Sequence, residues 1–360
     1  MINHDSERVY IIAEAGVNHN GRKDMAFSLV DAAAAAGADA VKFQTFNARK
    51  LAAKSAPKAA YQKTRTDEQE SQQAMLAKLE LPLEWHLELQ SHAHSKGVEF
   101  LSTAFDEDSL GFLSGLGMPV FKVPSGELTN APLLWQFART GKPLILSTGM
   151  AFLSEVEEAL AVVAHALSSP EEPAAIEDVW RCWSVAENRQ RLLHHVTLLH
   201  CTSQYPTAPA EVNLLAMDTL ASAFGLDVGY SDHTEGTLIP FAAVARGAKV
   251  IEKHFTLDRA LPGPDHMASL EPSELKSMVA GIRALQLALG DKAKAPQASE
   301  WDTRRAARQQ VVAVRDIRKG AILARHDLGT ARCGAGLAPN TLWGLVGKEA
   351  DRDYVAGESI

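Results

Sequence analysis

The sequence has little cysteine, no surplus of positive charge and no long apolar run. Its three cysteines, Cys182, Cys201 and Cys333, are far apart and odd in number, so they indicate neither a disulfide framework nor a cysteine zinc site. A net charge of −8 argues against general nucleic-acid binding, which needs an excess of lysine and arginine. The polar start "MINHDSERVY" and the lack of a bilayer-length apolar run predict no signal peptide and no membrane segment. We therefore expect a cytoplasmic protein whose partners are small molecules.

What is present is a repeat of short apolar runs and longer stretches of helical period. With 46% hydrophobic residues in 360, the chain can bury one large core and still form a small second domain. The alternation predicts a parallel sheet covered by helices, and eight runs predict a closed (β/α)₈ TIM barrel. A doubly wound open sheet is the alternative, but "EAGVNHNG" lacks the glycine spacing of a dinucleotide-binding fingerprint. The eight runs lie near Val9 to Glu14, Ala40 to Gln44, Val98 to Thr103, Val120 to Lys122, Leu144 to Ser147, Val196 to Cys201, Asp227 to Ser231 and Lys249 to His254.

Two segments do not fit the repeat. The polar stretch from about Leu167 to His195 is longer than a simple crossover, and we interpret it as a helical excursion on the surface. After the barrel, assigned to residues 1–290, residues 291–308 are rich in Ala, Lys and polar residues and predict a linker. Residues 309–360 have short β runs punctuated by glycine and predict a small, mostly-β domain.

Polar side chains end all eight predicted strands. Because the carboxyl ends of barrel strands point at a common centre, we expect these residues to converge on one functional site. Each residue alone has an ordinary structural explanation, but their coincidence on one rim favours function. The set comprises Glu14, Lys42, Gln44, Thr103, Lys122, Ser125, Glu127, Ser147, Thr148, His200, Thr202, Tyr205, Ser231, Asp232, His233, Glu252 and His254.

Two histidines at neighbouring strand ends indicate a metal site. Alternation along the last strand places Val250, Glu252 and His254 on one face, so His254 can point into the barrel mouth beside His233. Two imidazoles suit a divalent transition metal with positions left open for water or substrate. Glu252 or Asp232 is a candidate to orient an imidazole.

Two lysines, Lys42 and Lys122, end the second and fourth strands, where burying an ammonium is costly unless an anion is expected. They predict a phosphate or carboxylate pocket together with the hydroxyls of Thr103, Ser125 and Ser147. A structural alternative is that each lysine only pairs with Glu14 or Glu127. A chemical alternative is a Schiff base between a lysine and a carbonyl substrate, which would make the protein a metal-independent class I aldolase.

Nine motifs together resemble the bacterial sialic acid (N-acetylneuraminate) synthases and, more broadly, the nonulosonic acid synthases. The resemblance covers nearly the whole chain in order, and the tail is similar to the antifreeze-like (SAF) domain of that family. The motifs are "IIAEAGVNHNG", "VKFQTF", "FLSTAFD", "KVPSGE", "LILSTGM", "LLHCTSQYPT", "GYSDHT", "VIEKHFTLD" and "GPDHMASLEP".

The resemblance implies condensation of phosphoenolpyruvate with an open-chain N-acylated hexosamine, N-acetylmannosamine in the sialic acid case, with loss of phosphate by carbon–oxygen cleavage. It implies Mn²⁺ or Mg²⁺ on His233 and His254, with Glu14 as the acid/base. It assigns phosphoenolpyruvate to Lys42, Thr103, Lys122, Ser125, Ser147 and Ser231, and the sugar to Gln44, Glu127, Tyr205, Asp265 and Arg332.

The resemblance also implies a domain-swapped homodimer, in which an arginine of the tail reaches the partner's sugar. Here "RCGAG" keeps that arginine as Arg332, while Cys333 and Ala335 depart from the family's "RPGNG". Ser203 departs from an asparagine of some sialic acid synthases, and the excursion before "TLLHC" is unusual for the family. These departures make a diacetamido trideoxyhexose, giving legionaminic or pseudaminic acid, the leading alternative substrate. A sugar- or ice-binding protein without activity would explain the tail but not the polar rim.

Overall fold

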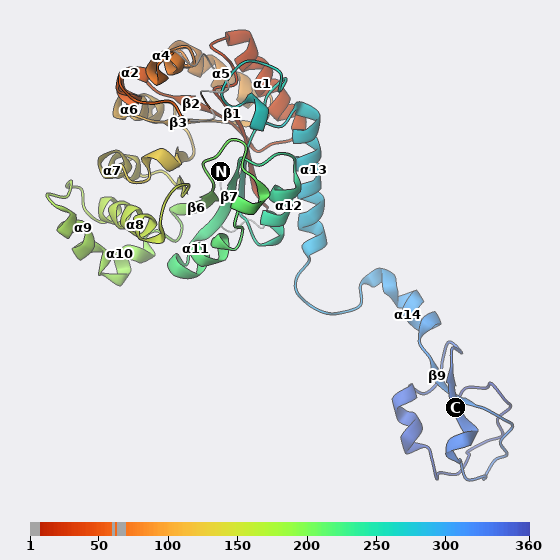
Figure 1. Cartoon of the computed structure of the whole chain (residues 1–360). Helices are drawn as coiled ribbons and strands as arrows, with labels where there is room; N and C mark the ends of the chain where they lie inside the picture. The colour runs from red at the N-terminus through yellow and green to blue at the C-terminus, as the bar shows by residue number, and fades with distance from the viewer. Residues whose placement is uncertain (1–7, 60–61, 63–69) are drawn as a thin grey trace. The chain divides into compact units, whose positions relative to one another are not determined.

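The computed structural model describes residues 8–59, 62 and 70–360, which divide into two compact units, Met1–Gly290 and Asp291–Ile360. Each unit has its own hydrophobic core. The first carries the eight-stranded sheet and the second a two-stranded sheet (Figure 1).

The first unit is the predicted barrel. Its eight parallel strands have the order β3-β2-β1-β8-β7-β6-β5-β4, and β3 also contacts β4, so the sheet closes on itself. Each predicted run overlaps one strand. The strands are β1 (Tyr10–Gly16), β2 (Ala40–Thr45), β3 (Glu99–Ala104), β4 (Phe121–Val123), β5 (Leu144–Ser147), β6 (Val196–Cys201), β7 (Asp227–Asp232) and β8 (Val250–His254).

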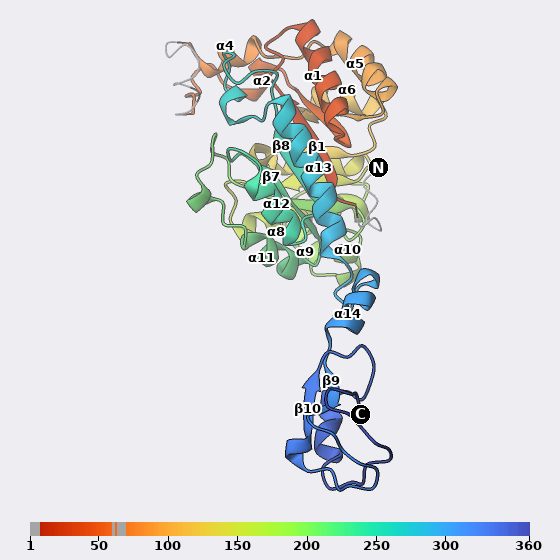
Figure 2. The same cartoon turned by 90° about the vertical axis from the view of Figure 1, so that its right-hand side faces the viewer.

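Helices surround the strands in Figure 1 and carry the chain from each strand to the next. Helix α13 packs against α1 and α12 and runs along the outside of the barrel in Figure 2. None of the described helices has the length and apolar character needed to cross a membrane. The barrel helices are α1 (Lys23–Ala36), α2 (Ala48–Leu51), α4 (Gln72–Ala77), α5 (Leu83–Ser95), α6 (Glu107–Gly115), α7 (Ala131–Arg139), α8 (Leu153–Ser168), α9 (Ile176–Trp183), α10 (Ala186–Gln190), α11 (Ala216–Phe224), α12 (Leu238–Ala245) and α13 (Pro272–Leu289).

Alternation along the strands separates two apolar layers. The outward-facing residues, such as Ile251 and Phe255, join the large core between sheet and helices. Inward-facing residues, among them Ile12, Leu101 and Val250, form a separate cluster inside the barrel. Because side chains alternate, the residue two positions further along each strand also points into the barrel. It lies closer to the carboxyl end of the barrel than this apolar cluster does. Those positions hold the polar residues of the site.

The predicted excursion is helical and consists of α9 and α10. Val179 of α9 is buried in the barrel core, and the indole nitrogen of Trp183 donates a hydrogen bond to Glu157 Oε1 of α8 at 2.9 Å. The excursion is therefore a packed addition to α8.

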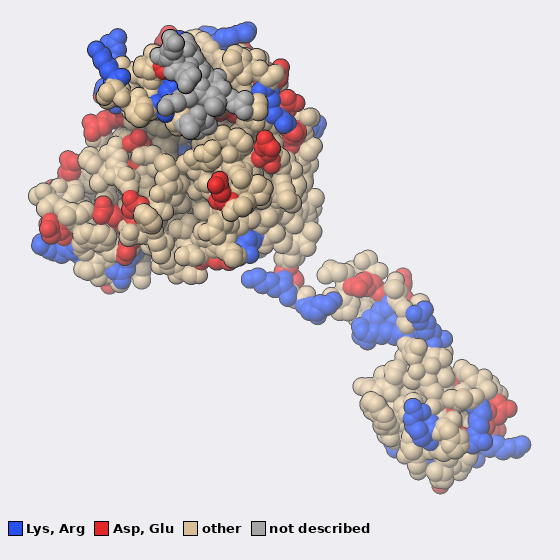
Figure 3. Space-filling model, viewed as in Figure 1, with Lys and Arg blue, Asp and Glu red and all other residues tan. Residues whose placement is uncertain are grey.

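The second unit is built on the antiparallel pair β9 (Gln310–Ala313) and β10 (Leu328–Ala331) around a small core that includes Val311, Leu328 and Tyr354. Within the segment predicted as a linker, the structure has the short helix α14 (Trp301–Ala307). The Arg304 guanidinium lies 5.4 Å from the centre of the Trp301 ring, a contact that stabilises this helix. Figure 3 shows Lys and Arg side chains gathered on this segment.

Candidate active site

A chain of four buried charges lies inside the carboxyl end of the barrel. Lys42 Nζ lies 2.7 Å from Glu14 Oε2 and 3.5 Å from Glu252 Oε2, and Lys122 Nζ lies 3.6 Å from Glu252 Oε1. All four side chains are at most 8% exposed. Burial of four charges is tolerable because cations and anions alternate along the chain.

Hydroxyl and amide groups complete this cluster. Each lysine donates to a hydroxyl, and each carboxylate accepts a hydrogen bond from a neutral side chain. Lys42 Nζ donates to Thr103 Oγ1 at 3.0 Å, Lys122 Nζ to Ser147 Oγ at 2.6 Å, Ser231 Oγ to Glu252 Oε1 at 2.8 Å, and Gln44 Nε2 to Glu14 Oε1 at 3.2 Å. Eight predicted residues that are far apart in the sequence therefore form one group joined by ion pairs and hydrogen bonds.

The structural alternative for the lysines is right in one respect, since Lys42 pairs with Glu14. Lys122 instead faces Glu252, while Glu127 accepts a hydrogen bond from Asn130 Nδ2 at 2.7 Å. Glu252 bridges both lysines, so the interpretation that it orients an imidazole is wrong.

The two carboxylates of the cluster differ in acidity. Burial raises the pKa of Glu14 to about 7, an effect that Lys42 opposes and the Glu252 charge reinforces. Burial also disfavours the Glu252 anion, but Lys122 and Lys42 outweigh it and lower the pKa of Glu252 to about 2. At neutral pH two lysines therefore face one fully ionised carboxylate and one that is close to half protonated. Burial lowers the pKa of Lys122, so an anion that enters beside this lysine would stabilise its charged form, and the cluster suits an anionic ligand.

Two imidazoles and a phenol ring stand beside the charged cluster. The ring centres of His233 and His254 are 5.5 Å apart, and Tyr205 lies 4.0 Å from His233 and 5.6 Å from His254. His233 Nδ1 lies 2.6 Å from the Thr202 carbonyl oxygen, so this nitrogen carries a proton and Nε2 is the nitrogen left for a metal. Burial, with help from the charges of His233 and Lys42, lowers the pKa of His254 well below its usual value. Burial also disfavours the His233 cation, but Cys201 and the Thr202 carbonyl outweigh it and raise the pKa of His233. His254 can therefore offer a neutral nitrogen, whereas His233 must lose a proton before it can bind a metal.

These two rings fit a metal ion. His254 Nδ1 is buried without a hydrogen-bond partner, which is costly for a polar atom unless a ligand satisfies it. Among the described residues, no group of three or more His, Cys, Asp or Glu side chains is arranged to hold a metal. The protein would thus supply two imidazoles and leave the other coordination positions to water and substrate.

On the outer face of β7 and β8, a fully buried ion pair lies behind the imidazoles. Lys253 Nζ lies 2.6 Å from Asp232 Oδ2, and both side chains are 0% exposed. Asp232 also accepts a hydrogen bond from the Thr234 backbone at 2.9 Å. Asp232 therefore binds Lys253 and the Thr234 backbone and not an imidazole, in contrast to the sequence-based interpretation. The pair ties together the residues that precede His233 and His254.

A cavity of about 440 Å³ opens above the cluster. Its polar half comes from the β4 to β8 side, where Ser125 accepts a hydrogen bond from the Gly149 backbone at 3.0 Å. A Cβ atom on Gly149 would lie 2.3 Å from Ser203 Oγ and 2.7 Å from Ser125 Oγ, so a larger residue fits there only if both serine side chains move. The other lining residues of this half are Lys122, Ser147, Cys201, Ser203, Tyr205, Ser231, His233 and Asp265.

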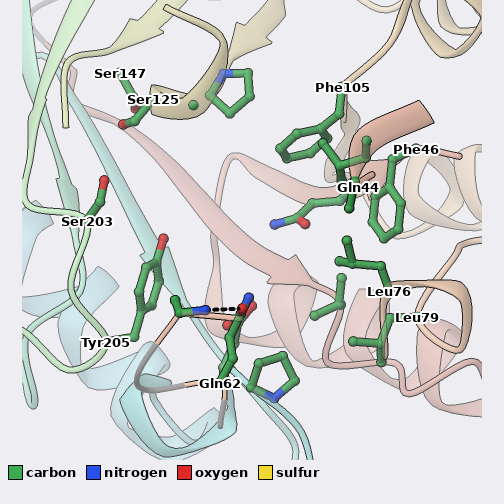
Figure 4. A pocket seen from close by; sticks show the side chains of 18 of the residues that line it. Gln44, Phe46, Gln62, Leu76, Leu79, Phe105, Ser125, Ser147, Ser203 and Tyr205 are labelled. Carbon is green, nitrogen blue, oxygen red and sulfur yellow. Dashed lines mark hydrogen bonds between the residues drawn. The ribbon is translucent and has the colours of Figure 1, made fainter. Parts of the chain in front are cut away.

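The opposite half of the cavity is apolar. We call it the apolar wall, and Figure 4 shows Phe46, Leu76, Leu79 and Phe105 across the cavity from the serines and Tyr205. Sequence reasoning missed this wall, because its residues lie in loops and short helices without a recognisable motif. The wall consists of Val17, Phe46, Leu51, Met75, Leu76, Leu79 and Phe105.

Most of the predicted site residues meet at this cavity or in the cluster beneath it. Asp265 lines the cavity, and burial raises its pKa to about 6. Glu127 is not among the described lining residues, and Arg332 belongs to the second unit, where its side chain is exposed. Sequence reasoning also missed Cys201, whose Sγ lies 3.8 Å from His233 Nδ1.

Comparison with known proteins agrees with this geometry. The NeuB family model matches residues 29–294, and the SAF domain model matches residues 308–360. N,N'-diacetyllegionaminic acid synthase of Campylobacter jejuni is 46% identical over 98% of this chain and 99% of its own length. The synthase of the same name from Legionella pneumophila is 46% identical over 98% of this chain and 93% of its own.

A solved structure leads to the same family. The N-acetylneuraminic acid (sialic acid) synthetase of Leptospira borgpetersenii has a TM-score of 0.66 and 34% identity, and the match covers 83% of this chain and 91% of that one. The sequence-based recognition and the barrel followed by an SAF domain are confirmed. The chain therefore belongs to the NeuB family, the nonulosonic acid synthases.

Proposed function

We propose that this enzyme is an N,N'-diacetyllegionaminic acid synthase, which condenses phosphoenolpyruvate with 2,4-diacetamido-2,4,6-trideoxymannose. The observation that carries the proposal is 46% identity to two synthases of that name along nearly the full chain. This is the alternative substrate of the sequence analysis, and the relatives support it better than N-acetylmannosamine. The apolar wall supports it as well, because this sugar has a methyl where N-acetylmannosamine has a hydroxymethyl group, and an acetamido group in place of the C4 hydroxyl.

Phosphoenolpyruvate binds at the charged cluster. Lys122, with Ser147 at 2.6 Å, lines the cavity and faces the anion directly. Lys42 adds positive charge from below, and Thr103 and Ser231 hold the cluster in place through their hydrogen bonds. Ser125, fixed by the Gly149 backbone, is a further hydroxyl for the phosphate or carboxylate.

The reaction joins the methylene carbon of phosphoenolpyruvate to the aldehyde carbon of the open-chain sugar. Water adds to the central carbon of phosphoenolpyruvate, and the tetrahedral intermediate expels phosphate by carbon–oxygen cleavage. Glu14, with a pKa of about 7, accepts the proton of that water. Mn²⁺ or Mg²⁺ on His233 and His254 would polarise the aldehyde. Gln44, Tyr205 and Asp265 face the sugar hydroxyls from around the cavity.

Schiff-base chemistry on Lys42 is less well supported. It requires a neutral amine, but Glu14 and Glu252 outweigh the effect of burial and raise the pKa of Lys42. If a lysine formed such a base with pyruvate, borohydride would reduce it to a stable covalent adduct. We expect no covalent adduct on Lys42. Burial lowers the pKa of Lys122, so an adduct on that lysine would instead support the aldolase alternative.

The test is phosphate release from phosphoenolpyruvate by the purified, Mn²⁺-loaded protein. We expect kcat/KM to be higher with 2,4-diacetamido-2,4,6-trideoxymannose than with N-acetylmannosamine, and excess EDTA to abolish release with both. Preference for N-acetylmannosamine would contradict the proposal and favour the second candidate, an N-acetylneuraminate synthase, which the Leptospira borgpetersenii structure supports. Release that EDTA leaves unchanged would contradict the metal assignment.

The homodimer and the sugar contact of Arg332 remain predictions from resemblance. Light scattering of the purified protein tests the dimer. Arg332→Ala, compared with exchange of the nearby exposed Arg318, tests the contact. We expect only the first change to raise the KM for the sugar.

A further inference from the structure

The apolar wall is a hydrophobic cluster of its own. Its buried members Val17, Phe46, Met75 and Leu79, and its partly buried members, do not belong to the main barrel core. Every member of the cluster lines the cavity. A cluster that only closed the protein interior would not place all its members against an open space, so the wall is built to meet something apolar.

Hydrogen bonds outside the cavity hold the wall in place. The backbone of Asn47 donates to Asp106 Oδ2 at 3.0 Å, and the backbone of Ala48 donates to Glu80 Oε1 at 2.6 Å. Gln73 Nε2 of α4 donates to the Ala52 carbonyl at 2.7 Å. Phe46 and Phe105 meet edge to face, with ring centres 5.9 Å apart. The wall is thus preformed and does not depend on ligand binding to assemble.

The position of the wall relative to the reacting groups determines which end of the sugar faces the wall. Lys122, Ser147 and His233 line the opposite half of the same cavity, so the aldehyde end of the sugar belongs there. The far end of the six-carbon chain then faces the wall (Figure 4).

We propose that the apolar wall is the specificity subsite for the C6 methyl and the C4 acetamido methyl of the acceptor sugar. This inference rests on the proposed function. N-acetylmannosamine would place hydroxyls at both positions against the seven apolar side chains of the wall, which pair poorly with them, although the amides of Gln44, Gln62 and Gln72 also line the cavity. The wall therefore favours the diacetamido trideoxy sugar and penalises its hydroxylated counterpart. One methyl group in such a pocket changes kcat/KM by about tenfold.

The experiment uses four acceptors that differ in one group at a time. They are N-acetylmannosamine, its 6-deoxy form, 2,4-diacetamido-2,4-dideoxymannose and 2,4-diacetamido-2,4,6-trideoxymannose. The enzymes are the wild type, Leu76→Asn and the conservative Leu76→Met. The control is Leu87→Asn, which changes a leucine of α5 that is 63% exposed. Thermal unfolding and the KM for phosphoenolpyruvate are measured for each.

In the wild type and in Leu87→Asn, we expect loss of the C6 hydroxyl to raise kcat/KM by about tenfold. Leu76→Asn should cut this preference to about twofold or less and lower kcat/KM for the diacetamido trideoxy sugar by about tenfold. Leu76→Met should keep the wild-type preference. The KM for phosphoenolpyruvate should stay unchanged in all variants.

Two contrary results differ in meaning. In the first, the wild type prefers the diacetamido trideoxy sugar, but Leu76→Asn lowers kcat/KM equally for all four acceptors. This result overturns the wall as a specificity subsite and leaves the proposed function intact. A wild type that prefers N-acetylmannosamine overturns both.

Discussion

The two halves of the active-site cavity differ in where their residues come from. In the polar half, Lys122, Ser147 and Ser231 belong to strands of the barrel, with inward-facing side chains fixed by the sheet. In the apolar wall, residues such as Leu51, Leu76 and Phe105 belong to short helices and loops that follow β2 and β3. We thus place the chemistry on the rigid sheet and the proposed selectivity on connections that can change without disturbing the sheet.

The largest expected effect comes from the polar half. Lys122→Met removes the ammonium group that lines the cavity and leaves Glu252 with one lysine fewer. We expect kcat/KM to fall by at least about 1000-fold, since both anion binding and stabilisation of developing charge are lost. Steady-state phosphate release measures it, with Leu76→Asn as the matched change in the apolar wall. Comparable losses of kcat/KM in the two variants would contradict the assignment of chemistry to the polar half and of selectivity to the apolar wall.

The second effect concerns the two imidazoles. His254→Ala should lower activity by about 100-fold or more, because it removes one of the two proposed metal ligands. Binding of Mn²⁺, followed by electron paramagnetic resonance of the free ion, should weaken in parallel. Leu76→Asn should bind Mn²⁺ as the wild type does. Unchanged Mn²⁺ affinity in His254→Ala would remove this residue from the metal site.

The third effect is a pH dependence that belongs to the polar half alone. Glu14 must be ionised to accept a proton, and its pKa is about 7. Below that value, falling pH protonates it, so log kcat/KM should drop by about one per pH unit. Glu252, with a pKa of about 2, should add no inflection between pH 5 and 8, whereas Asp265, with a pKa of about 6, titrates in this range and should steepen the fall below pH 6. A wild-type profile that stays flat from pH 8 to pH 5 would exclude Glu14 as the base, whereas Leu76→Asn should keep the wild-type profile.

The same contrast explains what could be predicted from sequence. The eight strands and the convergence of Lys42, Lys122, His233 and His254 followed from alternation, because a barrel forces alternate residues of every strand to one centre. The partners within the cluster did not follow. Glu252 and Asp232 both precede a histidine, yet Glu252 points inward to two lysines and Asp232 points outward to Lys253.

The apolar wall could not be predicted at all. Leu76 and Phe105 are far apart in the sequence and carry no motif, and apolar residues in helices and loops ordinarily indicate core. Only the three-dimensional arrangement shows that they face an open cavity. The helix α14 was hidden for a similar reason, since a segment rich in Ala, Lys and polar residues has the composition of a linker.

The smallest expected effect tests how closely the side chains of the polar half pack around Gly149. Gly149→Ala would place a methyl group 2.3 Å from Ser203 Oγ and 2.7 Å from Ser125 Oγ, so both side chains must move. Because Ser125 is assigned to phosphoenolpyruvate, the KM for phosphoenolpyruvate should rise by about tenfold while the ratio of kcat/KM between the acceptor sugars stays the same. Gly111→Ala in α6, which is not among the described lining residues and has no atom near the added carbon, is the control. If Gly149→Ala instead altered the preference among sugars and left phosphoenolpyruvate binding unchanged, selectivity would extend across the cavity, and the two halves would not act separately.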